Sequence, residues 1–206
     1  MKTLVLLGDG MGDFPVAELG DRTPLQAAQA PMMRKIAAHG ELRMVNTVPE
    51  GLPPGSDVAN MAILGYDAAL NYTGRAPIEA AGADIPMAPD EVAFRCNLVT
   101  VEEGTMLDYS AGHISTEEAT ELIEALQAEL GEAGITFHVG VQYRHLLIWK
   151  EGAADAFCMP PHEISDKAVA EYLPDGDGAE AVRTLMERSK AVLADHPVNI
   201  PLPPYH

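Results

Sequence analysis

The spacing of apolar and polar positions divides the chain into two segments with different elements. In the first segment, the uninterrupted apolar run at 3–7 is typical of a strand buried on both faces, and a second strand is expected at 41–48. The apolar spacing between them predicts a helix from about 25 to 38. Strand, helix and strand in this order predict a βαβ unit of a parallel sheet.

The second segment begins after a break marked by Pro86 and Pro89. Its pattern predicts strands at 92–101, 105–109, 135–140 and 144–150, with a hairpin through 102–104. A helix is expected between the two strand pairs and another at about 179–194. This order describes an α+β module that differs from the first βαβ unit.

Both expected helices show a clear apolar face. The first begins at the capping box Ser115–Glu118 and ends at Gly131. Its inward positions are Ala119, Leu122, Ile123, Leu126 and Leu130. The inward positions of the second are Val182, Leu185, Met186, Ser189 and Leu193.

The segment 51–67 places one hydroxyl, that of Ser56, at a turn that opens an expected helix. Two prolines and Gly55 precede it, and the run at 58–64 has the small and apolar residues of a buried helix. The free N–H groups and the positive dipole end of such a helix attract anions. A serine before an apolar run is also an ordinary N-cap residue. These residues alone therefore leave open both a phosphate-reactive serine and a helix cap.

An acidic residue follows the first expected strand. Asp9 lies in the glycine-rich turn at 8–13, and ligands bind at the carboxyl ends of strands in open α/β sheets. Carboxylate oxygens in such a turn can hold a divalent cation. A solvated acid in a Gly-Asp turn is the alternative. The glycine spacing of a dinucleotide-binding turn is not met.

Basic side chains at several positions are candidates for binding an anion. Arg75 lies in a Gly-Arg-Ala-Pro loop, where its planar guanidinium can bind a phosphate or carboxylate at two points. Arg144 and His145 begin a strand and face opposite sides, so one of them can point into a cleft, and we favour Arg144. His113 ends a turn before a helix, where a cap-region role is the alternative. Arg95 interrupts an apolar strand and is either a paired charge or a ligand.

Charge narrows the classes of partner. The 206 residues include 31 acidic and 13 basic side chains, for a formal net charge of −18. Such a surface repels nucleic acid, and an anionic substrate would need positive charge supplied locally by metals, helix N-termini or arginines.

No apolar run reaches the roughly 18 residues that cross a bilayer, and no export signal is present, so we expect a cytoplasmic protein without membrane contact. Cys96 and Cys158 have no metal-binding spacing and are expected to be buried thiols in a reducing compartment.

Ordered motifs across nearly the whole chain resemble the archaeal-type, 2,3-bisphosphoglycerate-independent phosphoglycerate mutases of the alkaline phosphatase superfamily. The motifs are those at 8–13, 54–67, 72–82, 94–97, 108–113, 143–147 and 196–199. The resemblance implies an α/β fold in which part of an alkaline-phosphatase-like parallel-sheet core (1–84) carries an inserted α+β domain (85–178), followed by a helix and tail that return toward the core (179–206). The inserted domain would close over the substrate and exclude water.

The same resemblance implies interconversion of 2-phosphoglycerate and 3-phosphoglycerate through a phosphoserine at Ser56, without 2,3-bisphosphoglycerate. Asp9 and Ser56 would bind metal, and a complete site would hold two divalent cations, manganese or magnesium. Coordination to a cation is one way to activate a serine hydroxyl. Phosphoglycerate is the expected small-molecule substrate, with Arg75, Arg144, His145 and His113 as substrate-binding residues.

The chain departs from the family pattern in its length. Members of the family are longer, and their remaining Asp and His ligands lie in a carboxyl-terminal half that is not found here. We therefore expect a fragment that is inactive alone and whose exposed strand edges favour homo-oligomers. A related phosphotransferase or phosphatase of the same superfamily, or a catalytically inactive module, are the alternatives.

Overall fold

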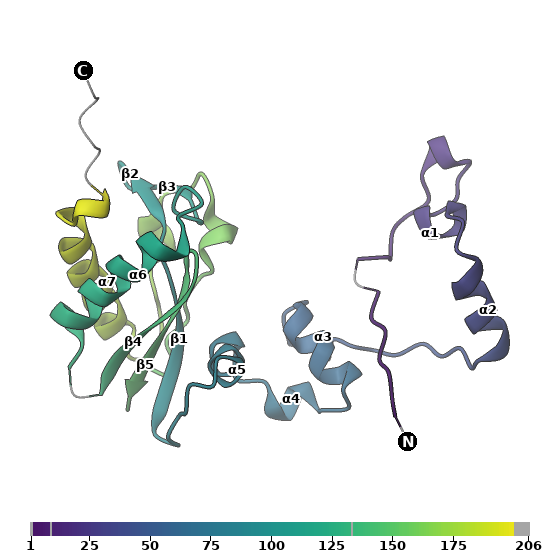
Figure 1. The fold of residues 1–206 in the computed structure, drawn as a ribbon, viewed down its shortest axis with the longest axis horizontal. Helices are drawn as coiled ribbons and strands as arrows, with labels where there is room; N and C mark the ends of the chain where they lie inside the picture. The colour runs from purple at the N-terminus through teal and green to yellow at the C-terminus, as the bar shows by residue number, and fades with distance from the viewer. Residues whose placement is uncertain (1, 9, 133, 200–206) are drawn as a thin grey trace. The chain divides into compact units, whose positions relative to one another are not determined.

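The computed structural model describes residues 2–8, 10–132 and 134–199. The chain divides into two units, 1–65 and 66–206 (Figure 1). The predicted division at 84 and 178 remains a prediction. Among the described residues, no helix is both long and apolar enough to cross a membrane.

The first unit contains short helices, and its described residues form no named strand. The helices are α1 (Pro24–Ala27), α2 (Pro31–His39) and α3 (Ser56–Ile63). The predicted helix at 25–38 is thus broken in two. Pro31 lacks an N–H group and disfavours a helical conformation in the residue before it, so it starts a new helix instead of continuing the first.

The strands predicted at 3–7 and 41–48 have no ladder partner among the described residues, so the predicted βαβ unit is not formed there. Their apolar side chains are exposed, with Leu4 at 88% and Met44 at 99%. A parallel strand needs hydrogen-bonding neighbours and helices over both faces of its sheet. The apolar pattern indicates that such segments are suited to burial, but it does not supply the neighbours.

The second unit is built on a three-stranded antiparallel sheet in the order β1–β5–β4 (Figure 1). Its strands are β1 (Glu91–Asn97), β4 (Ile135–Val141) and β5 (Arg144–Lys150). A separate hairpin pairs β2 (Thr100–Glu102) with β3 (Thr105–Asp108). The strand predicted at 92–101 is therefore split between two sheets. The α/β class is confirmed, and both sheets seen in the described residues are antiparallel.

Helices cover both faces of the three-stranded sheet. Helix α6 (Thr116–Leu130) packs against β4 with α7 (Ala179–Ala194) beside it, and α5 (Arg75–Gly82) packs against β1 (Figure 1). The core on the α6 side includes Leu122, Ile123, Leu126, Phe137, Leu147 and Leu185. The smaller core on the α5 side consists of Ala76, Ala80, Leu146 and Ile148.

The two long helices lie where the pattern predicts them. The capping box of α6 is present: the Ser115 hydroxyl accepts a hydrogen bond from the Glu118 N–H at 3.2 Å, and the Glu118 carboxylate accepts one from the Ser115 N–H at 3.1 Å. All five predicted core positions of α6 are buried. In α7 the inward position predicted for Met186 is wrong, since this side chain is 44% exposed. Because α7 packs against α6, only a narrow stripe of the α7 surface is buried.

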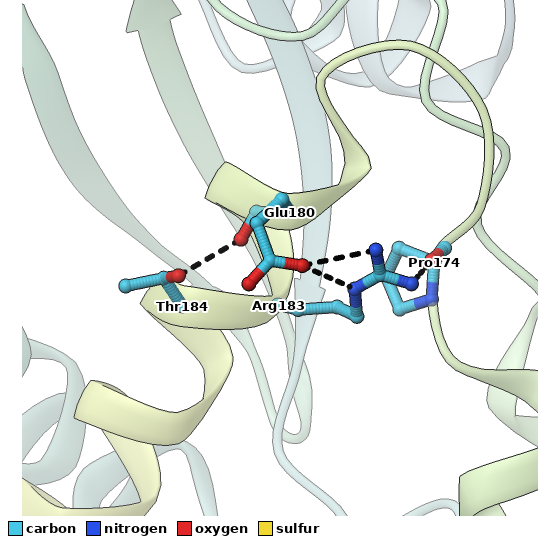
Figure 2. Close-up of polar contacts among 4 residues, drawn as sticks. All are labelled: Pro174, Glu180, Arg183 and Thr184. Carbon is cyan, nitrogen blue, oxygen red and sulfur yellow. Dashed lines mark hydrogen bonds and ion pairs between the residues drawn. The ribbon is translucent and has the colours of Figure 1, made fainter.

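Side-chain contacts tie the start of α7 to the loop before it. The N-cap, Gly178, has a φ of 77° and offers no side chain. Arg183 forms an ion pair with Glu180 at 3.0 Å and donates to the carbonyl of Pro174 at 3.0 Å, while the Thr184 hydroxyl donates to the carbonyl of Glu180 (Figure 2). These bonds hold the first turn of the helix in place.

The two cysteines differ in their surroundings. Cys96 packs against the α6-side core, and burial raises the pKa of its thiol to about 11. Cys158 is exposed, so its predicted burial is wrong. It lies in an irregular segment after β5, where no apolar period indicates which side chains turn inward.

Candidate functional site

Ser56 is the first residue of α3, and Gly55 is the N-cap of that helix. A capping serine would occupy the N-cap and accept a hydrogen bond from the second or third helical amide, so the cap alternative for Ser56 is wrong. Its side chain is exposed, and its hydroxyl has no hydrogen-bond partner in the part of the chain that the structure describes. The hydroxyl therefore lies beside the first N–H groups of α3, to which the N-cap Gly55 offers no side chain.

The predicted metal partner of Ser56, Asp9, lies outside the described residues. Carboxylate and hydroxyl oxygens suit magnesium or manganese. Two protein donors leave most of the roughly six positions of such a cation to other ligands. Among residues 2–8, 10–132 and 134–199, no group of three or more His, Cys, Asp and Glu side chains could hold a metal ion. Metal binding by Asp9 and Ser56 stays a prediction.

In the second unit, two arginines share the face of the sheet that α5 covers. Arg95 of β1 lies opposite Leu146 of β5, whose side chain packs with α5. Directly opposite residues of an antiparallel pair point to the same face, and so do residues two apart along a strand. Arg144, two residues before Leu146, therefore lies on this face as well.

Glu79 of α5 brings a third arginine to the same place. Its carboxylate lies 3.2 Å from Nε of Arg95 and 3.7 Å from Nε of Arg75. One carboxylate between two guanidinium groups leaves a net positive charge. Arg75 is the first residue of α5, so the loop predicted around it is wrong, and its side chain remains 54% exposed. For Arg95, the paired-charge alternative is the one observed.

Arg144 and His145 point to opposite sides of the sheet, as the strand alternation predicts. Arg144 is exposed, and its guanidinium carbon lies 5.4 Å from the centre of the Tyr143 ring. No described carboxylate lies within ion-pair distance of it. A guanidinium without a counter-ion in so acidic a protein is available to an anion.

His145 is only 2% exposed, and its Nδ1 accepts a hydrogen bond from the backbone N–H of Gly140 at 3.0 Å. Gly140 lies in a bulge of β4 between His138 and Val141, where the ladder with β5 is interrupted. The ring thus supplies an acceptor to an amide within the interrupted ladder. Burial lowers the pKa of His145 to about 4, so the ring is neutral at pH 7. Its role in substrate binding stays a prediction.

His113 ends a tight turn after β3. Ala111, Gly112 and His113 have φ values of 51°, 68° and 58°, a left-handed conformation that costs a non-glycine residue about 1–2 kcal/mol. The Asp108 carboxylate accepts three hydrogen bonds inside this turn: from the Ser110 hydroxyl at 2.6 Å, the Ser110 N–H at 2.7 Å and the Gly112 N–H at 2.8 Å. The bonds from Ser110 lower the pKa of Asp108 most. They also hold the strained turn.

Aromatic contacts join this turn to Arg144. Tyr109, within the turn, meets the Tyr143 ring edge-on with centroids 5.9 Å apart, and Arg144 lies over Tyr143. The His162 ring contacts Tyr109 at 6.2 Å. The structure therefore brings the His113 turn and Arg144 into one region. Neither tyrosine is predicted from the sequence as a site residue, nor is His162, although the tyrosines lie within the motifs at 108–113 and 143–147.

A family profile described as 2,3-bisphosphoglycerate-independent phosphoglycerate mutase matches residues 37–199. The chain belongs to this family. The matched range includes Ser56, the three arginines and His113, but not Asp9.

Individual relatives support membership of this mutase family. The 2,3-bisphosphoglycerate-independent phosphoglycerate mutase of Methanosarcina barkeri is 56% identical over 201 residues, which cover 97% of this chain and 50% of that protein. A probable mutase of Geobacter sulfurreducens is 51% identical, covering 96% of this chain and 50% of that protein. The chain spans about half the length of the curated relatives that it matches.

Two solved structures are similar to this mutase-family chain. The cofactor-independent phosphoglycerate mutase of Thermoplasma acidophilum is 31% identical with a TM-score of 0.52, covering 92% of this chain and 52% of that one. A protein of Pyrococcus horikoshii is 26% identical with a TM-score of 0.64, covering 93% of this chain and 44% of that one. The likeness supports the α/β fold, while the roles of single residues remain predictions.

Proposed function

We propose that this chain contributes the nucleophile and the anion-binding residues of a phosphoglycerate mutase that interconverts 2-phosphoglycerate and 3-phosphoglycerate without 2,3-bisphosphoglycerate. The observation that carries the proposal is the exposed Ser56 hydroxyl, which has no described partner and opens a helix whose N-cap, Gly55, offers no side chain. Membership of the mutase family supplies the reaction class.

In the proposed reaction, Oγ of Ser56 bonds to phosphorus as the C2–O–P bond of 2-phosphoglycerate breaks. The serine proton passes to the departing C2 oxygen. The 3-hydroxyl then attacks the phosphoserine, and its proton returns to Ser56, so nothing is consumed. The N–H groups at the start of α3 favour the phosphoryl charge. A divalent cation held by Asp9 and Ser56 would lower the pKa of the hydroxyl and neutralise phosphoryl oxygens.

We assign the substrate's anionic groups to Arg75 and Arg144, with His113 as a further contact to the substrate. Arg144 has no described counter-ion, and Arg75 shares its only described one with Arg95. Both can therefore accept a phosphate or carboxylate without first breaking a full ion pair. His145, the fourth predicted residue, is buried, so the core would have to open before it touched a ligand.

The remaining metal ligands are proposed to come from sequence outside these 206 residues, because the relatives are about twice as long. The chain alone is accordingly proposed to be inactive. We further propose a cytoplasmic location, no nucleic-acid partner in view of the net charge of −18, and association through the exposed apolar side chains of the segments 3–7 and 41–48.

The test is mutase activity of the polypeptide encoded by the whole reading frame. Ser56→Ala is expected to lower kcat by about 10³-fold or more, because the proposed phosphoserine cannot form without the Ser56 hydroxyl. Ser189→Ala, which removes a hydroxyl bonded within α7, serves as the control. Retained activity in Ser56→Ala overturns the proposal. Release of free phosphate in place of interconversion favours the phosphatase alternative.

A further inference from the structure

Ser110 lies between an acid and a histidine in the turn after β3. Its Oγ is 2.6 Å from Oδ1 of Asp108 and 3.5 Å from Nδ1 of His113. Although polar, Ser110 is only 3% exposed, whereas His113 is exposed. The arrangement therefore has a buried middle and an exposed imidazole at its end.

The direction of the hydrogen bonds follows from the proton count. A serine hydroxyl has one proton to donate, and an ionised carboxylate can only accept. The short distance to Asp108 assigns the Ser110 proton to that carboxylate, which hydrogen bonds keep ionised. Oγ of Ser110 then faces His113 with a lone pair. Nδ1 of His113 must be the donor in this contact, since two acceptors would repel each other.

We propose that Asp108 and Ser110 are positioning residues that hold His113 in the Nδ1–H tautomer, so that Nε2 is the nitrogen presented to the substrate. The inference rests on the proposed function, in which His113 contacts phosphoglycerate. When the ring is neutral, its Nε2 lone pair accepts a hydrogen bond from a hydroxyl of the glycerate.

The backbone of the turn supports this role. Three successive residues, Ala111 to His113, keep left-handed φ values, and strain of this kind persists only where surrounding bonds over-determine it. The bond from the Gly112 N–H to Oδ2 of Asp108 at 2.8 Å supplies such a constraint directly before His113. The contacts of Tyr109 with Tyr143, over which Arg144 lies, bring the same turn to an arginine proposed to bind the substrate.

The experiment is ¹⁵N NMR of the histidine ring nitrogens in the full 206-residue chain, at about pH 8, where an ordinary histidine is neutral. The His113 signals are identified by their loss in His113→Gln. We expect protonated Nδ1 and unprotonated Nε2, the reverse of the preference of free histidine in water.

Two variants separate the contact from general effects. Ser110→Ala is expected to invert the tautomer ratio to that of free histidine, while Ser189→Ala, which removes a partly buried hydroxyl of α7, leaves it unchanged. A protonated Nε2 in the unmodified chain, or an unchanged ratio in Ser110→Ala, overturns the proposal. The unmodified chain decides alone if Ser110→Ala does not fold. The tautomer ratio is measured without substrate, so it does not depend on whether the chain belongs to an active mutase. Failure of the tautomer proposal can therefore be told apart from failure of the proposed function.

Discussion

Nδ1 of His145 accepts a hydrogen bond from the backbone N–H of Gly140 at 3.0 Å, inside the bulge of β4. The ring therefore belongs to the packing of the sheet as well as to the predicted set of substrate-binding residues. Its burial has consequences for stability that can be measured without any substrate.

We predict that His145 makes the second unit less stable in mild acid. Its pKa is lowered from 6.5 to about 4 in the folded state, so the unfolded chain binds the proton first as the pH falls. The stability contributed by the neutral ring is present above pH 6.5 and is lost between there and about pH 4. The loss should be on the order of 2–3 kcal/mol in the free energy of unfolding, measured by urea denaturation.

The variant His145→Gln provides the comparison, because its amide oxygen can still accept the Gly140 N–H but does not titrate. The difference in unfolding free energy between the unmodified chain and this variant should shrink or reverse between pH 7 and pH 4. Parallel pH profiles for the two proteins would show that His145 is not the titrating group.

Gly140→Ala should destabilise the second unit by about 1–3 kcal/mol. A Cβ atom at this position would lie 2.1 Å from the backbone carbonyl oxygen of Arg144, and backbone cannot move aside as a flexible side chain can. Gly82→Ala is the matched control, since nothing lies within 4 Å of its Cβ and the site is helical. This control should be neutral or stabilising by about 0.5–1 kcal/mol. Equal thermal midpoints for the two variants would contradict the prediction.

The sequence predicts those elements whose stabilising contacts repeat along one face. The five core positions of α6 follow the helical period, and the opposite directions of Arg144 and His145 follow strand alternation. The strands predicted at 3–7 and 41–48 are not formed among the described residues. Strand pairing depends on neighbouring strands, which the local apolar pattern does not specify.

Within the candidate site, the sequence identified the basic residues but not how they are held. Glu79 joins Arg75 to Arg95 because α5 packs on β1, a tertiary contact without a local signal. The relation of Ser110 to Asp108 is close in sequence, yet it depends on left-handed φ values at Ala111 and His113, which the letters alone do not indicate.

Asp108→Asn should loosen the turn that carries His113. The carboxylate accepts three hydrogen bonds, and those from Ser110 lower its pKa below the usual value of 3.8. Its stabilising effect is therefore present above pH 3.8 and is lost as the pH falls through the lower folded pKa. At neutral pH, the variant should show faster amide hydrogen exchange at Gly112 and Ser110. Asp195→Asn, at the exposed end of α7, should leave those two amides unchanged; equal exchange in all three proteins would refute the prediction.

Leu126→Ala should cost about 2–5 kcal/mol of unfolding free energy, because its side chain is 1% exposed in the α6-side core and its removal leaves a cavity. Leu70→Ala removes the same atoms from a residue that is 82% exposed. That control should change stability by less than about 0.5 kcal/mol. Chemical denaturation of both variants measures the difference, and similar midpoints would place Leu126 outside the cooperative core.

A chain beginning at Tyr66 should fold without residues 1–65. Both buried clusters, on the α6 side and on the α5 side of the sheet, are composed entirely of residues after this boundary. The capping box of α6 and the ion pairs of Glu79 also lie within it. The shortened chain should therefore keep a single cooperative unfolding transition, and Leu126→Ala should lower its midpoint as it does in the full chain. Loss of the transition on removal of 1–65 would mean that the first unit completes the core of the second.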